Sequence, residues 1–151
     1  MAKAIKEYVT DNIYETLGDI AQLTGFENDA TVQREKPRGV PRKDREITIV
    51  DLGDTPITDS PLNKDDYTAN YALHCRCLVS DEIDGTAPTV DQQLSRLIGD
   101  VRKALMQDYT RGANAINTMI GQDGPLPTGD DGRTLPVQVH YRTAKDDPFS
   151  L

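Results

Sequence analysis

Apolar residues near the start of the chain recur at steps of three and four, which is the spacing of one face of an α-helix. Polar residues occupy the positions between them, and Gly25 stands where a helix commonly ends. The pattern therefore predicts an amphipathic helix over residues 4–24. Its apolar face would consist of Ile5, Val9, Ile13, Leu17, Ile20 and Leu23.

Alternating apolar and polar residues, the spacing of a half-buried strand, occur in three later segments. Residues 46–52 (EITIVDL) and 135–143 (LPVQVHYRT) are short examples, and residues 67–80 (YTANYALHCRCLVS) form the longest one. Residues 30–35 (ATVQRE) are compatible with a further short strand. Pro136 indicates that the last strand either lies at a sheet edge or begins near this proline. The predicted inward-facing side chains are Tyr67, Tyr71, Leu73, Cys75, Cys77, Val79, Leu135, Val137, Val139 and Tyr141.

A second amphipathic helix is predicted over residues 89–108. Thr89 and Gln92 have the spacing of a capping box at its start. Apolar residues again recur at steps of three and four, so one face of this helix is expected to be buried. That apolar stripe consists of Val90, Leu94, Leu97, Ile98, Val101 and Leu105.

Two longer segments show neither the three-to-four-residue spacing of a helix nor the alternation of a strand. Residues 53–66 are polar and contain two prolines, so we expect a loop there. Residues 110–134 contain five glycines and two prolines, and a loop of this length is usually functional or disordered. An apolar patch within it is equally compatible with a turn of helix or a strand. The patch consists of Ala115, Ile116, Met119 and Ile120.

Each amphipathic helix needs an apolar surface to cover, and the apolar face of a sheet supplies one. We therefore expect an α+β fold in which an antiparallel sheet of about four strands packs against two amphipathic helices on one side. The opposite face of the sheet is partly polar, so it is expected to be wet or covered by a neighbouring copy. The length fits a single domain over residues 1–151.

Composition excludes several classes of protein. The 151 residues include 17 basic and 25 acidic side chains, a net charge of −8. No run approaches the roughly 18 apolar residues of a membrane span, and the first ten residues lack the apolar centre of a secretory signal. An acidic chain is also a poor candidate for a protein that reads DNA sequence, which needs a basic surface.

The positive charge is concentrated in a basic loop at residues 34–45 (REKPRGVPRKDR), whereas residues 51–151 carry 9 basic and 16 acidic side chains. One interpretation is a solvated turn, and the other is a contact for an acidic partner. The basic side chains are Arg34, Lys36, Arg38, Arg42, Lys43 and Arg45.

Motifs for catalysis or metal binding are sparse. Cys75 and Cys77 stand two apart on a predicted strand while His74 points to the other face, so they are expected to be buried thiols rather than zinc ligands. The aspartates of the glycine-rich loop do not have the spacing of a calcium loop. No phosphate-binding loop, dinucleotide fingerprint, nucleophile elbow or zinc-protease motif occurs. We therefore expect no enzymatic activity, no cofactor and no metal.

The layout of the chain resembles the tail terminator proteins of long-tailed bacteriophages, the minor tail protein U-like group. The resemblance covers nearly the whole chain and is distributed over several pieces. These pieces are the opening helix IKEYVTDNIYETLGDI, the strand and turn EITIVDLGD, the long strand YTANYALHCRCLV, the helix LSRLIGDVRKALMQD and the ending VQVHYRTAKDDPF.

The resemblance implies a small α/β sandwich and a structural role in the virion. Proteins of this group form a ring, typically of six copies, at the head–tail junction. The ring caps the tail tube, stops its polymerisation and offers a surface to a head-side connector or neck protein, while DNA passes through it. The resemblance implies no catalysis and no cofactor.

A ring needs two different surfaces on each copy, and we expect the basic loop of one copy to face acidic residues of the next. Acidic residues of the glycine-rich loop are expected to line the channel, because like charge keeps DNA from sticking. The C-terminal tail, residues 144–151, either docks on a partner or is disordered. The acidic interface residues are Asp59, Asp65, Asp66, Asp81, Glu82 and Asp84. The channel residues are Asp123, Asp130 and Asp131, and the docking residues are Asp146, Asp147 and Phe149.

Two other interpretations remain open. The first is a related assembly protein, such as a neck or head-completion ring or a tail tube subunit. A tube subunit would polymerise without limit, whereas a terminator stops at one ring. The second, disfavoured by the missing motifs, is a small enzyme or metal-binding domain.

Overall fold

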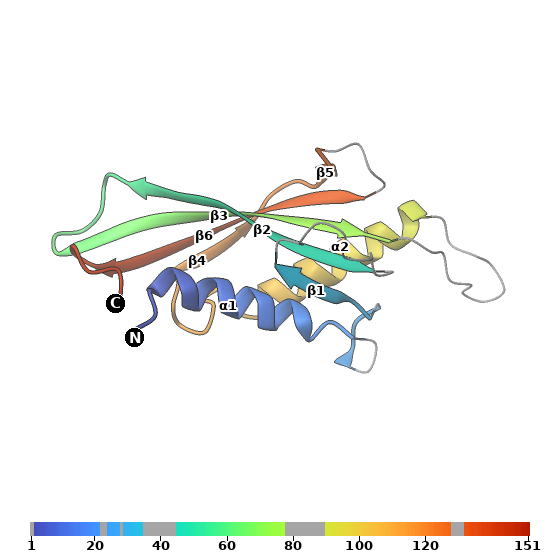
Figure 1. Ribbon diagram of the computed structural model, residues 1–151, viewed down its shortest axis with the longest axis horizontal. Coiled ribbons are helices and arrows are strands. Elements are labelled where there is room, and N and C mark those ends of the chain that lie inside the picture. Colours follow the sequence, from blue (N-terminus) through green and yellow to red (C-terminus); the bar gives the residue numbers. More distant parts are fainter. Residues whose placement is uncertain (1, 22–23, 28, 35–44, 78–89, 128–131) are drawn as a thin grey trace.

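The computed structural model describes residues 2–21, 24–27, 29–34, 45–77, 90–127 and 132–151. Within these residues the chain forms two helices and six strands (Figure 1). In chain order they are α1 (Ile5–Gly18), β1 (Thr31–Arg34), β2 (Glu46–Ile57), β3 (Lys64–Arg76), α2 (Val90–Met106), β4 (Asn117–Ile120), β5 (Gly124–Pro125) and β6 (Arg133–Ala144).

The strands form one mixed sheet in the order β1-β2-β3-β6-β4, with β5 also paired to β6. β1 runs parallel to β2, and every other pair is antiparallel. The expected sheet of about four antiparallel strands is therefore wrong in both number and type. Alternation along a strand reports which face is buried and not the direction of the neighbour, so the parallel pair had no signal in the pattern.

Both helices pack into the core on the same face of the sheet, and Figure 1 shows α1 below the sheet. Together with the inward-facing side chains of β2, β3 and β6 they enclose one apolar core. The inward side chains of β6 are buried as predicted, and so are Tyr71, Leu73 and both cysteines, Cys75 in β3 and Cys77 just beyond it. The helices contribute Ile5, Val9, Ile13, Leu17, Leu94, Leu97, Ile98, Val101, Ala104 and Leu105.

Helix α1 ends at Gly18, six residues before the predicted end of the helix at residue 24. Asp19 closes it, with its amide bonded back to the last turn. Ile20 follows outside the helix, yet it is buried in the same core. The apolar spacing therefore continues past the end of the helix because Ile20 still contacts the core. Gly25, with φ +92°, lies in a separate turn.

Strand β2 continues to Ile57, so the prediction of a loop over residues 53–66 is wrong at both ends. Strands β2 and β3 instead pair as a hairpin that closes between Ile57 and Lys64. The outer half of β2 is exposed, which removes the apolar alternation that marks a half-buried strand.

Pro136 does not mark an edge or a strand start, because β6 lies between β3 and β4. Its carbonyl accepts a hydrogen bond from the amide of Gly121, just beyond the end of β4, with N···O 2.9 Å. The nitrogen and carbonyl of one strand residue point to the same neighbour. The missing N–H of the proline therefore faces Gly121 and leaves the ladder to β3 intact.

The second half of the apolar patch, Met119 and Ile120, lies in strand β4, whereas Ala115 and Ile116 precede the strand. Helix α2 confirms the second amphipathic helix, although Thr89 and the proposed cap lie outside the described residues. Neither described helix is long and apolar enough to cross a membrane.

Candidate subunit interface at the two sheet edges

The outer half of β2 forms an open sheet edge. The pairing of β1 with β2 stops at Ile49, and none of the described strands pairs with β2 on that side beyond it. Residues 51–56 are exposed, and Leu52 has 63% of its surface accessible. A row of free backbone groups with an exposed apolar side chain is a template for another strand.

A β-bulge shapes this edge between Asp51 and Gly53. Gly53 adopts φ +92°, a conformation that favours glycine, and its amide donates to Asp51 Oδ1 at 2.8 Å. Bulges of this kind bend a strand and increase its twist. The bulge therefore turns the outer half of β2 relative to the half that covers the core.

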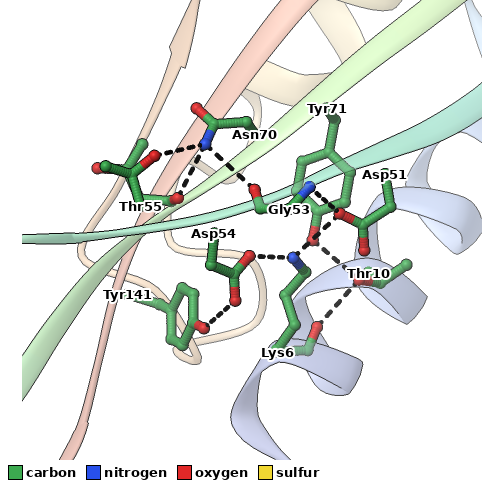
Figure 2. A network of polar contacts seen from close by, with 10 residues as sticks. Lys6, Thr10, Asp51, Gly53, Asp54, Thr55, Asn70, Tyr71 and Tyr141 are labelled. Carbon is green, nitrogen blue, oxygen red and sulfur yellow. Dashed lines mark hydrogen bonds and ion pairs between the residues drawn. The ribbon is translucent and has the colours of Figure 1, made fainter.

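A polar network fastens this half of β2 to helix α1 (Figure 2). Lys6 of α1 forms ion pairs with Asp51 and Asp54 of β2, and its ammonium group lies 5.0 Å from the ring centre of Tyr71. The Lys6 side chain is only 19% exposed. Because Lys6 and Asp54 (26% exposed) are both largely shielded from water, we expect their pair to be stronger than an ordinary surface ion pair, whereas Asp51 is 49% exposed.

Two tyrosines of the central strands complete the network in Figure 2. Tyr141 donates its hydroxyl hydrogen to Asp54 Oδ2 at 2.5 Å, and the Tyr71 hydroxyl lies 2.8 Å from Thr10 Oγ1. Burial raises the pKa of both phenols above the usual range, with the adjacent Asp54 adding to the effect at Tyr141. Both tyrosines therefore stay protonated and serve as fixed hydrogen-bonding groups.

Strand β4 forms the opposite edge of the sheet. It pairs with β6 on one side and with no described strand on the other. The Gly121 amide points to β6, and successive residues of a strand point alternately. Thr118 and Ile120 therefore direct their backbone N–H and C=O groups to the open side.

Exposed apolar side chains occur in β4, at the end of α2 and in the segment between them. Such side chains next to free strand groups mark an interaction surface. Arg102 of α2 lies close by, donating to the carbonyl of Gly121 at 3.1 Å. The exposed apolar residues are Met106 (50%), Tyr109 (52%), Ile116 (41%) and Met119 (48%).

The described part of the basic loop turns toward its own chain. Arg34 pairs with Asp11 of α1 and lies over the ring of Tyr14, 5.6 Å from its centre. Arg45 immediately precedes β2, and its carbonyl accepts the amide of Thr31. The other predicted members, Lys36, Arg38, Arg42 and Lys43, lie outside the described residues.

The acidic residues predicted for the interface occupy different environments. Asp59 is exposed in the β2–β3 turn, whereas Asp65 accepts the amide of Asp146. Asp66 is buried and accepts two hydrogen bonds from Arg142, while His140 Nε2 lies 3.0 Å away. The Arg142 hydrogen bond lowers the pKa of Asp66. Asp81, Glu82 and Asp84 lie outside the described residues.

Asp123, the described member of the predicted channel lining, pairs with Arg133 at 2.9 Å and with Arg102 at 3.4 Å. Its pKa is lowered, chiefly by the Arg133 hydrogen bond. Two arginines thus offset the negative charge that was expected to repel DNA. Asp130 and Asp131 lie outside the described residues.

The C-terminal tail is folded back as a turn. Asp147 accepts the amide of Phe149 and the hydroxyl of Ser150, and the Pro148 carbonyl accepts the amide of Ile5 at the start of α1. Phe149 remains 51% exposed. Of the three residues predicted to dock a partner, Asp146 and Asp147 hold the turn, and Phe149 presents an apolar surface.

Cys75 and Cys77 are buried thiols that are not joined in a disulfide, which confirms the prediction of a buried pair. Burial raises the pKa of the Cys75 thiol to about 12, so it is not a reactive thiolate at neutral pH. Among the described residues, no three His, Cys, Asp or Glu side chains gather as a metal site would require.

The sheet edges were missed at the sequence level, although part of their signal was visible. The stretch VDLGDTP places a glycine and an isolated leucine among polar residues, which is compatible with a bulged, exposed strand as well as with a loop. No protein-family model matches this chain, and no curated protein matches it significantly.

Proposed function

We propose that this protein is a ring-forming structural protein of the phage tail-terminator kind. In this role it caps the tail tube, ends its polymerisation and provides the surface to which the head-side connector joins. The observation that supports the proposal is the pair of open sheet edges, which lie on opposite sides of the sheet and differ in sequence and exposed side chains.

Two different edges favour head-to-tail association. A self-complementary surface closes a two-fold dimer, whereas two unlike surfaces on opposite sides generate a ring when the rotation closes. The opening helix, the mixed sheet and the second helix leave both edges uncovered within the described residues. The proposal requires no catalytic group, cofactor or membrane, and DNA would pass the ring without sequence-specific contacts.

The second candidate is a tail tube subunit. The same unlike edges support it, because a head-to-tail contact whose rotation does not close within one plane produces a helical assembly. The two candidates differ in one property: a terminator stops at a single ring, whereas a tube subunit continues.

Light scattering and negative-stain electron microscopy of the purified protein test the proposal. Discrete closed rings whose mass is an integral multiple of 16.7 kDa would support it. Helical tubes of growing length would favour the tube subunit instead. Monomers at concentrations up to about 100 μM, well above the Kd range of a standard-size interface, would contradict both candidates.

A further inference from the structure

Strand β4 and the open half of β2 lie at the same height on the sheet. Through the registers of β6 and β3, Ile120 is level with Asp51, and Asn117 is level with Thr55. The four residues of β4 therefore match the part of β2 that β1 leaves unpaired. Neither edge needs to slide along the strand direction to meet the other on a second copy.

Strand direction also fits. β2 and β3, β3 and β6, and β6 and β4 are each antiparallel, so β4 runs opposite to β2. A second copy placed beside the first, in the same orientation, brings its β2 next to β4 as an antiparallel neighbour. Thr118 and Ile120 direct their free backbone groups to this side, and antiparallel pairing uses such groups at alternate residues.

Side chains at the two edges are complementary as well. Leu52, 63% exposed, stands within the open half of β2, and Met119, 48% exposed, occupies the corresponding part of β4. On the helix side of the sheet, Asp51 would come opposite Ile120, beside Arg102, whose guanidinium already reaches the carbonyl of Gly121. An apolar contact and an opposite-charge contact thus coincide in one register.

We propose that copies of this chain join by antiparallel pairing of β4 with β2 of the next copy, with Asn117 opposite Thr55. The proposal rests on the ring-forming function proposed above and specifies its interface. The sheet then continues from copy to copy, and neither of these two edges remains open once the ring closes.

Disulfide cross-linking tests this register. Asn117 and Thr55 are exposed and share the sheet face opposite the helices, and residues directly opposite each other have Cβ atoms about 4.5–5.5 Å apart. This separation is close enough for a disulfide after small adjustments. The double variant N117C/T55C, oxidised with oxidised glutathione, should give a ladder on a non-reducing gel that ends at the size of the ring.

Three control variants make the result specific. N117C/I57C moves one cysteine two residues along the same face of β2, and its cross-linking should be at least about tenfold weaker because the diagonal separation is about 7–8 Å. N117C and T55C alone should stay monomeric on the gel, since the native cysteines are buried. A cross-linked dimer from either single variant would indicate self-pairing of one edge and overturn the proposal.

Light scattering on the same samples tests the ring-forming function separately from the proposed strand register. Rings that form without the N117C/T55C ladder would overturn the register and leave the ring-forming function standing. Monomers by light scattering would overturn both. The ladder in N117C/T55C, together with its strong reduction in N117C/I57C, is the result that the proposed interface requires.

Discussion

At the scale of single residues, the sheet is packed so closely at a few glycines that a side chain would not fit there. Gly121 is the clearest case, because a Cβ atom built there would lie 2.7 Å from Pro136 Cγ. No such contact is tolerated without a shift, and the neighbour is a ring with little freedom. The glycine thus permits the close approach that satisfies the Pro136 carbonyl at the end of β4.

We expect Gly121→Ala to lower the free energy of unfolding by about 1–3 kcal/mol, the usual cost of overpacking. Gly99→Ala is the matched control, because Gly99 lies in α2 and a Cβ atom added there would meet nothing within 4 Å. Removing backbone freedom there should stabilise the protein by about 0.5–1 kcal/mol. Urea unfolding of both variants measures the difference, and equal effects would contradict the packing argument.

Asp66 provides a pH-dependent contribution to stability. Because Arg142 and His140 bind its carboxylate, the folded-state pKa lies below the unfolded value. This contribution is therefore complete above the unfolded pKa of about 3.9 and is lost as the pH falls through the lower folded pKa. We expect Asp66→Asn to cost about 1–3 kcal/mol at pH 7, the penalty for a buried group deprived of its charged partner.

Chemical unfolding of Asp66→Asn and the parent protein at several pH values tests this expectation. The difference in stability should shrink below about pH 4, because there the carboxylate takes up a proton more readily in the unfolded parent chain than in the folded one. Asp59→Asn is a suitable control, since Asp59 is exposed in the β2–β3 turn and should change stability by less than about 0.5 kcal/mol. A pH-independent loss in Asp66→Asn would argue against an ionic role.

At the scale of elements, the placement of β2 depends on helix α1. Lys6 joins them through its ion pairs with Asp51 and Asp54, and replacing it by methionine keeps the apolar stem while removing the charge. We expect Lys6→Met to lower stability by about 1–2 kcal/mol, as for a lost charged hydrogen bond. Amide hydrogen exchange in residues 53–57 should accelerate more than exchange in β6.

Lys3→Met is the corresponding control for that experiment. Lys3 also pairs with an aspartate, Asp11, but its side chain is 52% exposed. Exposed ion pairs contribute little, so replacing Lys3 should leave stability and the exchange rates of residues 53–57 nearly unchanged. Equal acceleration of exchange by both variants would show that Lys6 does not fasten β2 in particular.

The elements also show how far sequence patterns reach. Apolar periodicity identified both helices and the buried faces of β3 and β6, because those residues contact the core. It failed for Asp54 and Thr55 of β2, which are exposed and carry no burial signal. It also missed the parallel pairing of β1, whose partner is chosen by tertiary packing, and left β4 undecided because four residues are too few to establish a period.

The candidate site was less predictable still. Charge along the sequence drew attention to the basic loop, yet Arg34 pairs within its own chain and Asp66 is buried. An open sheet edge is defined by the strand that is missing beside it, and a single sequence contains no record of that absence. Only the assembled sheet shows that Asn117 and Thr55 lie at the same level along the strands, at opposite edges of the sheet.

At the scale of the whole molecule, the apolar side chains on the two edges should control association without controlling folding. Leu52 and Met119 are both largely exposed in the single copy. We expect Leu52→Lys and Met119→Lys each to reduce ring formation about tenfold or more, because a charged side chain on a strand edge opposes pairing. The melting temperature of the isolated chain should change by only about 2 °C or less for such surface replacements.

Leu62→Lys supplies the control for both edge variants. Leu62 is 91% exposed in the turn between β2 and β3, away from the strand pairs proposed to join. Its replacement should leave the ring intact by light scattering. If all three variants disassembled the ring alike, a general charge effect would explain the result better than edge pairing.

The hydrogen bond from the Ile5 amide to the Pro148 carbonyl has a consequence for the order of events during synthesis. Figure 1 shows the N and C labels close together, and the first turn of α1 is completed by a residue that is synthesised long after it. β3 likewise waits for β6 on one of its sides. Contacts between residues so far apart in the sequence form slowly during folding. In a nascent chain the edge of β3 that pairs with β6 therefore stays exposed until β6 has been synthesised. Pairing of that edge with another chain is avoided only if β6 is synthesised and pairs with β3 before the two chains meet.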